Sequence, residues 1–176
     1  MAATFKAIAT VTVGSGGSSS ISFSSIPATY NDLCVLLSVR TTGDQASVNY
    51  CQLRMTYNGS SSSYSYRLQY GIAAVGNGTL SSNSTTEVTW AGAVNDSTST
   101  SNTFASNMIY IQEYASSNYK SASHDGTSES NDSSVLNTLT ASLWSNTSAI
   151  TSITFTPETG NFAQYSTATL YGIKNN

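Results

Sequence analysis

The sequence predicts an all-β protein: a single-domain antiparallel β-sandwich of about ten strands, with a jelly roll as the favoured topology. Hydrophobic and polar residues alternate with a period of two, and clusters of Gly, Asn and Ser interrupt the alternation about every ten residues. Helical patterns are nearly absent from the chain. Its 176 residues suit one domain, 1–176, because no linker or internal repeat divides them.

Five strands are expected before residue 71. Residues 33–40 are apolar at nearly every position, which indicates a strand at the centre of a sheet. The preceding strand ends ahead of Pro27, because proline cannot donate a hydrogen bond to a β-ladder. Asn58-Gly59 favours a hairpin between the last two strands, since both residues tolerate a positive φ. The five ranges are 4–13, 19–26, 33–40, 48–57 and 64–70.

The second half of the chain begins with a segment of weak pattern. Residues 71–85 lack regular alternation and are predicted to be a long surface excursion. Strand patterns then resume in six segments. One of them, 135–144, also carries apolar residues at helical spacing, so a short helix is the alternative to the strand that we favour. The six ranges are 86–91, 103–113, 119–123, 135–144, 150–156 and 162–173.

Uncharged groups supply most of the polarity. Only 9% of residues are charged, against about a quarter in an average domain, whereas 34 are Ser and 24 are Thr. The six basic residues are scattered, which argues against nucleic-acid binding. No apolar run approaches the roughly 20 residues that span a bilayer, so we expect no membrane segment. The N-terminal residues alternate like a strand and do not resemble a signal peptide.

The two cysteines are predicted to be free thiols. If residues 33–40 and 48–57 form a hairpin, Leu33 and Cys51 face the core and Cys34 faces the opposite side. Because side chains alternate strictly along a strand, this mismatch forbids a disulfide. Free thiols are typical of a protein made in a reducing cytoplasm.

No residue pattern indicates catalysis, a cofactor or a metal. His124 and Asp125 are adjacent, but adjacency does not build a catalytic triad, and the chain has no G-x-S-x-G motif. We therefore expect His124 in a surface loop. A single His and two Cys without C-x-x-C spacing do not make a zinc site. The glutamates that a glycosidase would pair are dispersed, at Glu87, Glu113, Glu129 and Glu158.

One further segment can be interpreted either as a calcium-binding loop or as a simple turn. Residues 125–132, DGTSESND, are rich in oxygen ligands and could hold calcium, although they lack the twelve-residue EF-hand pattern. A turn made of turn-forming residues is the interpretation that we favour.

Tyrosines gather in the segment 57–70. Such residues form half-buried cross-strand pairs, which is the role that we favour, or a platform for a sugar or a protein partner. In the second case the contact residues are Tyr64, Tyr66 and Tyr70.

The low charge of the expected surface indicates that the protein associates with other subunits. A sandwich coated with Ser, Thr and Asn has few charges to repel neighbours, and its edge strands are exposed unless something covers them. Coverage by identical copies is the simplest solution, and we expect a homo-oligomer, a trimer. Contacts made by such a surface depend little on salt.

Three segments resemble a family of small virion proteins of tailed phages, particularly phages of cyanobacteria and other aquatic bacteria. They are SISFSSIPATYNDLCVLLSVR, NTFASNMIYIQEYASSNYKSAS and LWSNTSAITSITFTPETGNFAQYSTATLYGIKNN. The C-terminal segment is the most specific, and residues 71–101 do not match the pattern. The resemblance implies a phage particle and carries no catalytic motif.

The expected function is therefore that of a capsid decoration or cement protein. It would assemble in the host cytoplasm, lie on the capsid surface of the virion and bind the major capsid protein. The alternative is a tail-associated receptor-binding module that recognises a host-surface glycan. An enzyme, such as a depolymerase, is not expected.

Overall fold

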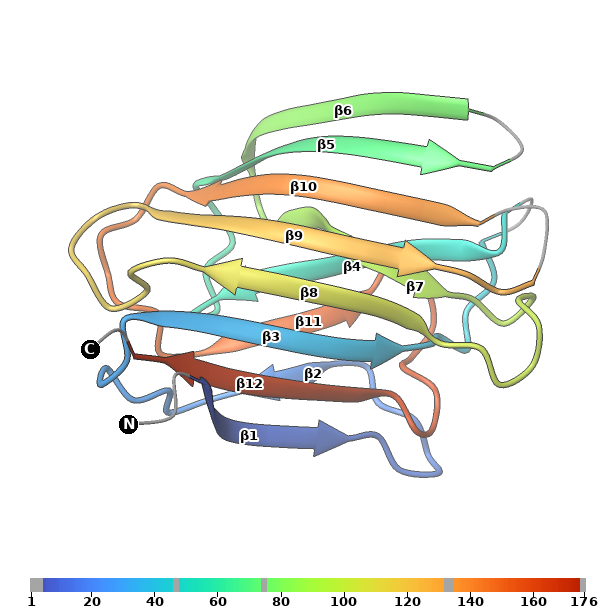
Figure 1. Ribbon diagram of the computed structural model, residues 1–176, viewed down its shortest axis with the longest axis horizontal. Helices are drawn as coiled ribbons and strands as arrows, with labels where there is room; N and C mark the ends of the chain where they lie inside the picture. Colours follow the sequence, from blue (N-terminus) through green and yellow to red (C-terminus); the bar gives the residue numbers. More distant parts are fainter. Residues whose placement is uncertain (1–4, 46–47, 74–75, 132–134, 175–176) are drawn as a thin grey trace.

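The computed structural model describes residues 5–45, 48–73, 76–131 and 135–174, and these form strands and no helix (Figure 1). The all-β prediction is confirmed. The twelve strands are β1 (Phe5–Thr12), β2 (Ile21–Phe23), β3 (Asp32–Val39), β4 (Tyr50–Tyr57), β5 (Tyr64–Ile72), β6 (Gly76–Thr85), β7 (Val88–Asn95), β8 (Ala105–Ile111), β9 (Lys120–Ser128), β10 (Leu136–Trp144), β11 (Ile153–Pro157) and β12 (Thr167–Ile173).

Two antiparallel sheets make up the sandwich. The large sheet has the order β1-β12-β3-β8-β9-β10-β5-β6, and the small sheet has the order β2-β11-β4-β7. Eight of these strands pair as the nested set β1–β12, β2–β11, β3–β8 and β4–β7, which is one long hairpin rolled into two layers. This nesting is the topology of a jelly roll. The predicted architecture is therefore correct.

Two insertions enlarge the jelly roll. β5 and β6 lie between β4 and β7 in the chain, and β9 and β10 lie between β8 and β11. All four join the large sheet beyond β8. Figure 1 shows that β5 and β6 extend past the small sheet, at the edge of the molecule opposite β1. We call the pair β5 and β6 the overhang.

The two predicted hairpins are wrong. β3 and β4 belong to different sheets, and so do β4 and β5. Asn58 and Gly59 do adopt positive φ values of 53° and 66°, as the turn chemistry predicts. The turn nevertheless carries the chain from one layer to the other, because β4 pairs with β11 and β7 while β5 pairs with β10 and β6.

Two ambiguous segments are strands. Residues 136–144 form β10, which confirms the strand over the helix. Residues 76–85 form β6, so the predicted surface excursion is wrong over this range. β6 is held by its pairing with β5, and none of its ten residues is buried. Its sequence, GNGTLSSNST, therefore lacks the alternation that burial imposes on other strands.

Aromatic residues fill the core near the β4–β5 turn. Trp144 lies with its ring centroid 5.6 Å from that of Tyr57, and it stacks on Tyr64 at 6.1 Å and 17°. The Tyr64 hydroxyl accepts a hydrogen bond from the Tyr57 backbone N–H at 2.7 Å. Three large rings thus supply apolar area in a chain with few large aliphatic residues.

A buried amide joins the two sheets. Asn107, on β8, accepts a hydrogen bond from the Ala93 N–H at 2.8 Å through Oδ1 and donates to the Ala93 carbonyl at 2.9 Å through Nδ2. The side chain therefore pairs with β7 as another strand would. Gly92 and Gly126 make room for it, since a Cβ at either position would come within 2.6 Å of Oδ1.

The cysteines are free, as predicted, although the predicted hairpin is wrong. Cys51 lies in the core between the sheets. Cys34 is also buried, but it lies between its cross-strand partners Tyr110 and Tyr171, outside the core cluster. The thickness of the large sheet separates the two sulfur atoms.

Candidate functional site

The three candidate tyrosines on β5 all face the small sheet, because they lie two or four residues apart. Tyr64 is 1% exposed and Tyr66 is 9% exposed, so both belong to the core. Tyr70 is half-buried, and of the three it is the one that retains an accessible ring. Burial thus supports the structural role for Tyr64 and Tyr66 and leaves Tyr70 as a contact residue.

Tyr70 lines an aromatic crevice between the overhang and the small sheet. The cavity has a volume of about 160 Å³. We define the aromatic crevice by its lining residues Tyr50, Tyr70, Ile72, Leu80, Trp90 and Leu136. They come from β4, β5, β6, β7 and β10, so the site exists only where the overhang meets the small sheet.

A β-bulge accompanies Trp90. Where β4 pairs with β7, Trp90 is the middle of three β7 residues that lie opposite the single residue Arg54. Bulges re-aim side chains and are frequent beside functional sites. The bulge lies at the free edge of the small sheet, where β7 faces the overhang.

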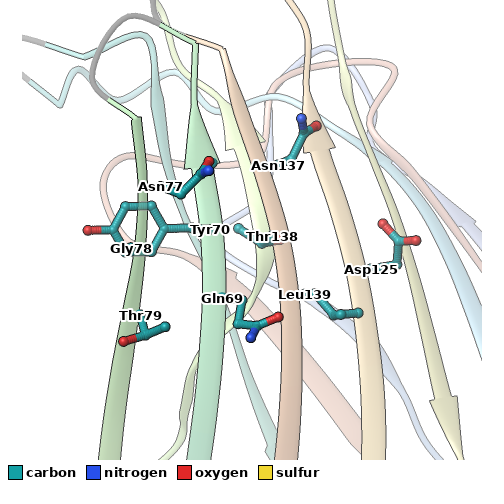
Figure 2. A pocket seen from close by; sticks show the side chains of 10 residues that line it. Gln69, Tyr70, Asn77, Gly78, Thr79, Asp125, Asn137, Thr138 and Leu139 are labelled. Atoms are coloured by element: carbon teal, nitrogen blue, oxygen red, sulfur yellow. The ribbon is translucent and has the colours of Figure 1, made fainter.

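Tyr70 is positioned by a glycine. Its cross-strand partner on β6 is Gly78, and a Cβ at Gly78 would come 2.4 Å from the Tyr70 hydroxyl. The ring therefore lies across β6 at Gly78, where that strand has no side chain, as Figure 2 shows. Aromatic rings that cover an edge glycine in this way stabilise strand pairing.

The polar atoms of the aromatic crevice are available to a ligand. Within the described ranges, the hydroxyls of Tyr50 and Tyr70 and the indole N–H of Trp90 make no hydrogen bond. Burial raises the pKa of Tyr50, and the nearby Tyr70 adds to the increase. The Tyr50 phenol is therefore protonated at neutral pH and can donate a hydrogen bond.

The opposite face of the overhang carries a shallow outer groove. Two adjoining hollows of about 710 and 430 Å³ make it up, and they share Gln69, Thr79 and Leu139. Figure 2 shows the residues that line the larger of the two. A row of directly paired residues crosses the groove, and its members are Asp125, Leu139, Gln69 and Thr79. The row continues to Met108 and Leu36 on the exposed face of the jelly roll. This face is polar with isolated apolar side chains.

His124 is not a surface residue, so that prediction is wrong. It is 1% exposed on β9, and Nε2 lies 2.7 Å from Ser142 Oγ on β10. Asp125 points to the opposite face, because neighbours on a strand alternate. Burial lowers the pKa of His124 to about 4, with the Ala91 carbonyl opposing the decrease. No carboxylate of the described residues hydrogen-bonds to this neutral imidazole, so none orients it as a base.

The predicted turn at 125–132 is wrong over its first four residues, which form the end of β9. Asp132 lies outside the described residues. Among the residues that the structure describes, no three His, Cys, Asp or Glu side chains gather as a metal site would require.

Two of the dispersed glutamates meet around a cation. Arg54 lies 3.3 Å from Glu87 and 3.4 Å from Glu158. The Arg54 guanidinium pairs with both carboxylates, whereas a glycosidase pair needs open space for a sugar between them. Sequence spacing gave no sign of this contact, since the two glutamates come from segments 71 residues apart.

Other charges serve the fold. Arg40 donates hydrogen bonds to the carbonyls of Ser99 at 2.8 Å and Thr100 at 2.9 Å and so holds the β7–β8 loop. The buried Lys120 donates to the Ser116 carbonyl at 2.8 Å and to that of Asn118. Both side chains replace water as partners of loop carbonyls.

Comparisons with known proteins identify no relative: no protein-family model, curated protein or solved structure matches this chain. The described part of the chain contains no helix that is long and apolar enough to cross a membrane.

Proposed function

We propose that this chain is a structural protein of a tailed-phage particle, a capsid decoration protein that forms a homotrimer and binds the major capsid protein on the assembled head. In this role it acts by binding and catalyses no reaction. The resemblance of three sequence segments to phage virion proteins supports a place for this protein in a phage particle. The edge strand β6 supports a role in assembly.

β6 is the observation that carries the proposal. It is a ten-residue strand at the end of the large sheet, and its sequence contains no charged residue and no proline. Soluble proteins commonly protect such edges with lysine, proline or a bulge, because free backbone groups pair with other chains. β1, at the other end of the sheet, has Lys6. Both edge strands carry a register shift, between Ala7 and Ala9 on β1 and between Ser82 and Thr85 on β6.

The two edges therefore differ in charge: β1 carries a lysine and β6 carries none, which favours β6 as the docking side. A strand of a neighbouring subunit can add to β6 through backbone hydrogen bonds, which is a common mode of protein recognition. Binding only to the assembled head stabilises it by mass action, by about 4 kcal/mol per site at a thousandfold excess over Kd. Many copies on one lattice act together.

The test is the copy number in purified particles. Quantitative mass spectrometry of whole virions and of DNA-filled heads without tails is expected to find hundreds of copies in both. A protein that is absent from tailless heads, or present in only a few dozen copies that follow the tails, would overturn the decoration role.

A second function, recognition of a host-surface glycan by a tail-associated module, is favoured by the aromatic crevice. A concave site with aromatic walls and a few convergent polar groups is the usual form of a small-ligand site. The same copy-number measurement separates this role from the first.

A further inference from the structure

We propose that the aromatic crevice binds one neutral pyranose residue of a glycan, with the ring against Trp90 and Tyr70 and its hydroxyls hydrogen-bonded to the phenols and the indole. The inference rests on the second of the two proposed functions for its biological meaning. Its test needs only the purified chain.

The size of the crevice suits a single ring. Its volume of about 160 Å³ equals the liquid volume of about five water molecules. That space admits one six-membered ring with its substituents and excludes a chain of several sugars. A longer glycan would therefore present one residue to the crevice and continue outside it.

The chemistry of the walls suits a sugar. Tyr and Trp present an apolar face and a polar edge, which match the C–H faces and the hydroxyls of a pyranose. None of the six lining residues is charged. An ionic ligand would lose hydration without a counter-charge, so a neutral sugar is favoured over an acidic or basic one.

An apolar side chain from a protein partner fits less well. It would bury the hydroxyls of Tyr50 and Tyr70 and the Trp90 N–H, which have no hydrogen-bond partner within the described residues. A buried donor without a partner is costly. A ligand that carries hydroxyl groups at its rim satisfies these donors, and a leucine or phenylalanine does not.

The walls are already in place without a ligand. The β7 bulge sets the position of Trp90, and the missing side chain at Gly78 sets that of Tyr70. These are independent irregularities in two different sheets, and both lead to the same cavity. A site formed in advance loses less conformational entropy on binding.

The experiment begins with a printed glycan array probed with the purified chain, followed by titration with methyl glycosides of the sugars retained. The two tryptophans allow a direct readout. Trp144 is 2% exposed and packed against Tyr57 and Tyr64, so a saturable fluorescence change reports on Trp90. We expect such a change, and we expect Trp90→Phe to abolish it.

Two conservative variants test the hydrogen bonds. Tyr70→Phe and Tyr50→Phe each remove one hydroxyl and keep the ring, and each is expected to weaken binding by about fivefold to tenfold. Tyr165→Phe is the matched control, because Tyr165 is 68% exposed and does not line the crevice. Near-ultraviolet circular dichroism confirms that each variant is folded.

Three results would overturn the inference: no sugar retained on the array, binding unchanged in both folded phenylalanine variants, or occupation of the crevice by apolar peptides alone. None of them affects the copy number in the particle. Failure of the sugar site and failure of the decoration role are therefore separate outcomes.

Discussion

Asn107 provides the sharpest stability test of a single side chain. Replacing it with alanine removes both hydrogen bonds to Ala93 and leaves a buried N–H and a buried carbonyl without partners. We expect Asn107→Ala to lower the free energy of unfolding by about 2–4 kcal/mol, from the cost of two unsatisfied groups. Urea denaturation measures the change.

Asn137→Ala is the control for Asn107→Ala. Asn137 lies on the exposed face of the same sheet, and its substitution is expected to change the unfolding free energy by at most about 0.5 kcal/mol. Equal effects of the two substitutions would show that the amide bridge does not stabilise the sandwich.

His124 makes stability depend on pH. Its pKa in the folded protein is about 4, below the ordinary histidine value of 6.5, so the unfolded chain binds a proton between these values that the folded protein does not. The contribution of neutral His124 to the free energy of unfolding is complete above pH 6.5. It is lost as the pH falls towards 4, and the loss amounts to at most about 3 kcal/mol. Guanidinium unfolding at pH 7 and pH 4.5 measures it.

The variant His124→Gln isolates this effect, because His124 is the single histidine of the chain. We expect the variant to lose the part of the pH dependence that histidine causes, while the carboxylate part remains. Parallel curves of unfolding free energy against pH for the variant and the unmodified protein would contradict a buried neutral His124.

Alternation in the sequence predicts which side chains face inward, but not what they meet there. The inward side of 48–57 follows from period two alone. The burial of His124 could not be predicted, because Ser142 and Ala91, which flank it, lie on other strands. A polar residue is buried when distant residues offer it partners, and sequence spacing does not record them.

At the scale of strands, β6 predicts an asymmetry between the two ends of the large sheet. A lysine on a docking edge strand opposes pairing with another chain. We expect Ser81→Lys, on β6, to weaken binding to stripped phage heads by about tenfold or more. Co-sedimentation with the heads measures the effect.

Thr12→Lys, on the exposed β1 edge, is the matched control and is expected to bind as the unmodified protein does. Both substitutions replace an exposed residue, so both variants should unfold within about 0.5 kcal/mol of the original. Equal binding of Ser81→Lys and the unmodified protein would remove β6 from the interface.

Strand boundaries were easier to predict than strand partners. Asn58-Gly59 makes the expected turn, yet the strands on either side of it enter different sheets. Turn chemistry acts locally. The pairing partner of each strand depends instead on the whole nested set β1–β12, β2–β11, β3–β8 and β4–β7. β6 escaped prediction because none of its residues is buried, so its sequence has no hydrophobic period.

The layered architecture of the whole molecule determines its thiol chemistry. Cys34 and Cys51 belong to different sheets, and burial raises the pKa of Cys51 to about 11. We expect thiol reagents to modify both residues slowly in the folded protein and rapidly after denaturation, since the thiolate is the reactive form.

Addition of a reductant should leave Tm unchanged, and the intact mass should correspond to two free thiols. A mass lower by two hydrogens, or a fall in Tm on reduction, would contradict the separation of the two cysteines by the large sheet.

The aromatic crevice could be predicted only in part. The tyrosine cluster drew attention to Tyr70, but Tyr50 and Trp90 come from strands of the other sheet. The overhang that brings the three together contains β6, which the hydrophobic pattern does not predict. Because the aromatic crevice depends on this insertion, it can be predicted only when the position of the insertion in the fold is known.

β12 lies between β1 and β3, and it is the sole neighbour of β1 in the large sheet. During synthesis the sheet therefore stays divided until residues 167–173 have emerged from the ribosome. Polysomes hold several such incomplete chains close together, with open backbone edges that can cross-pair. We expect the cellular yield of this protein to depend strongly on chaperones that shield nascent chains.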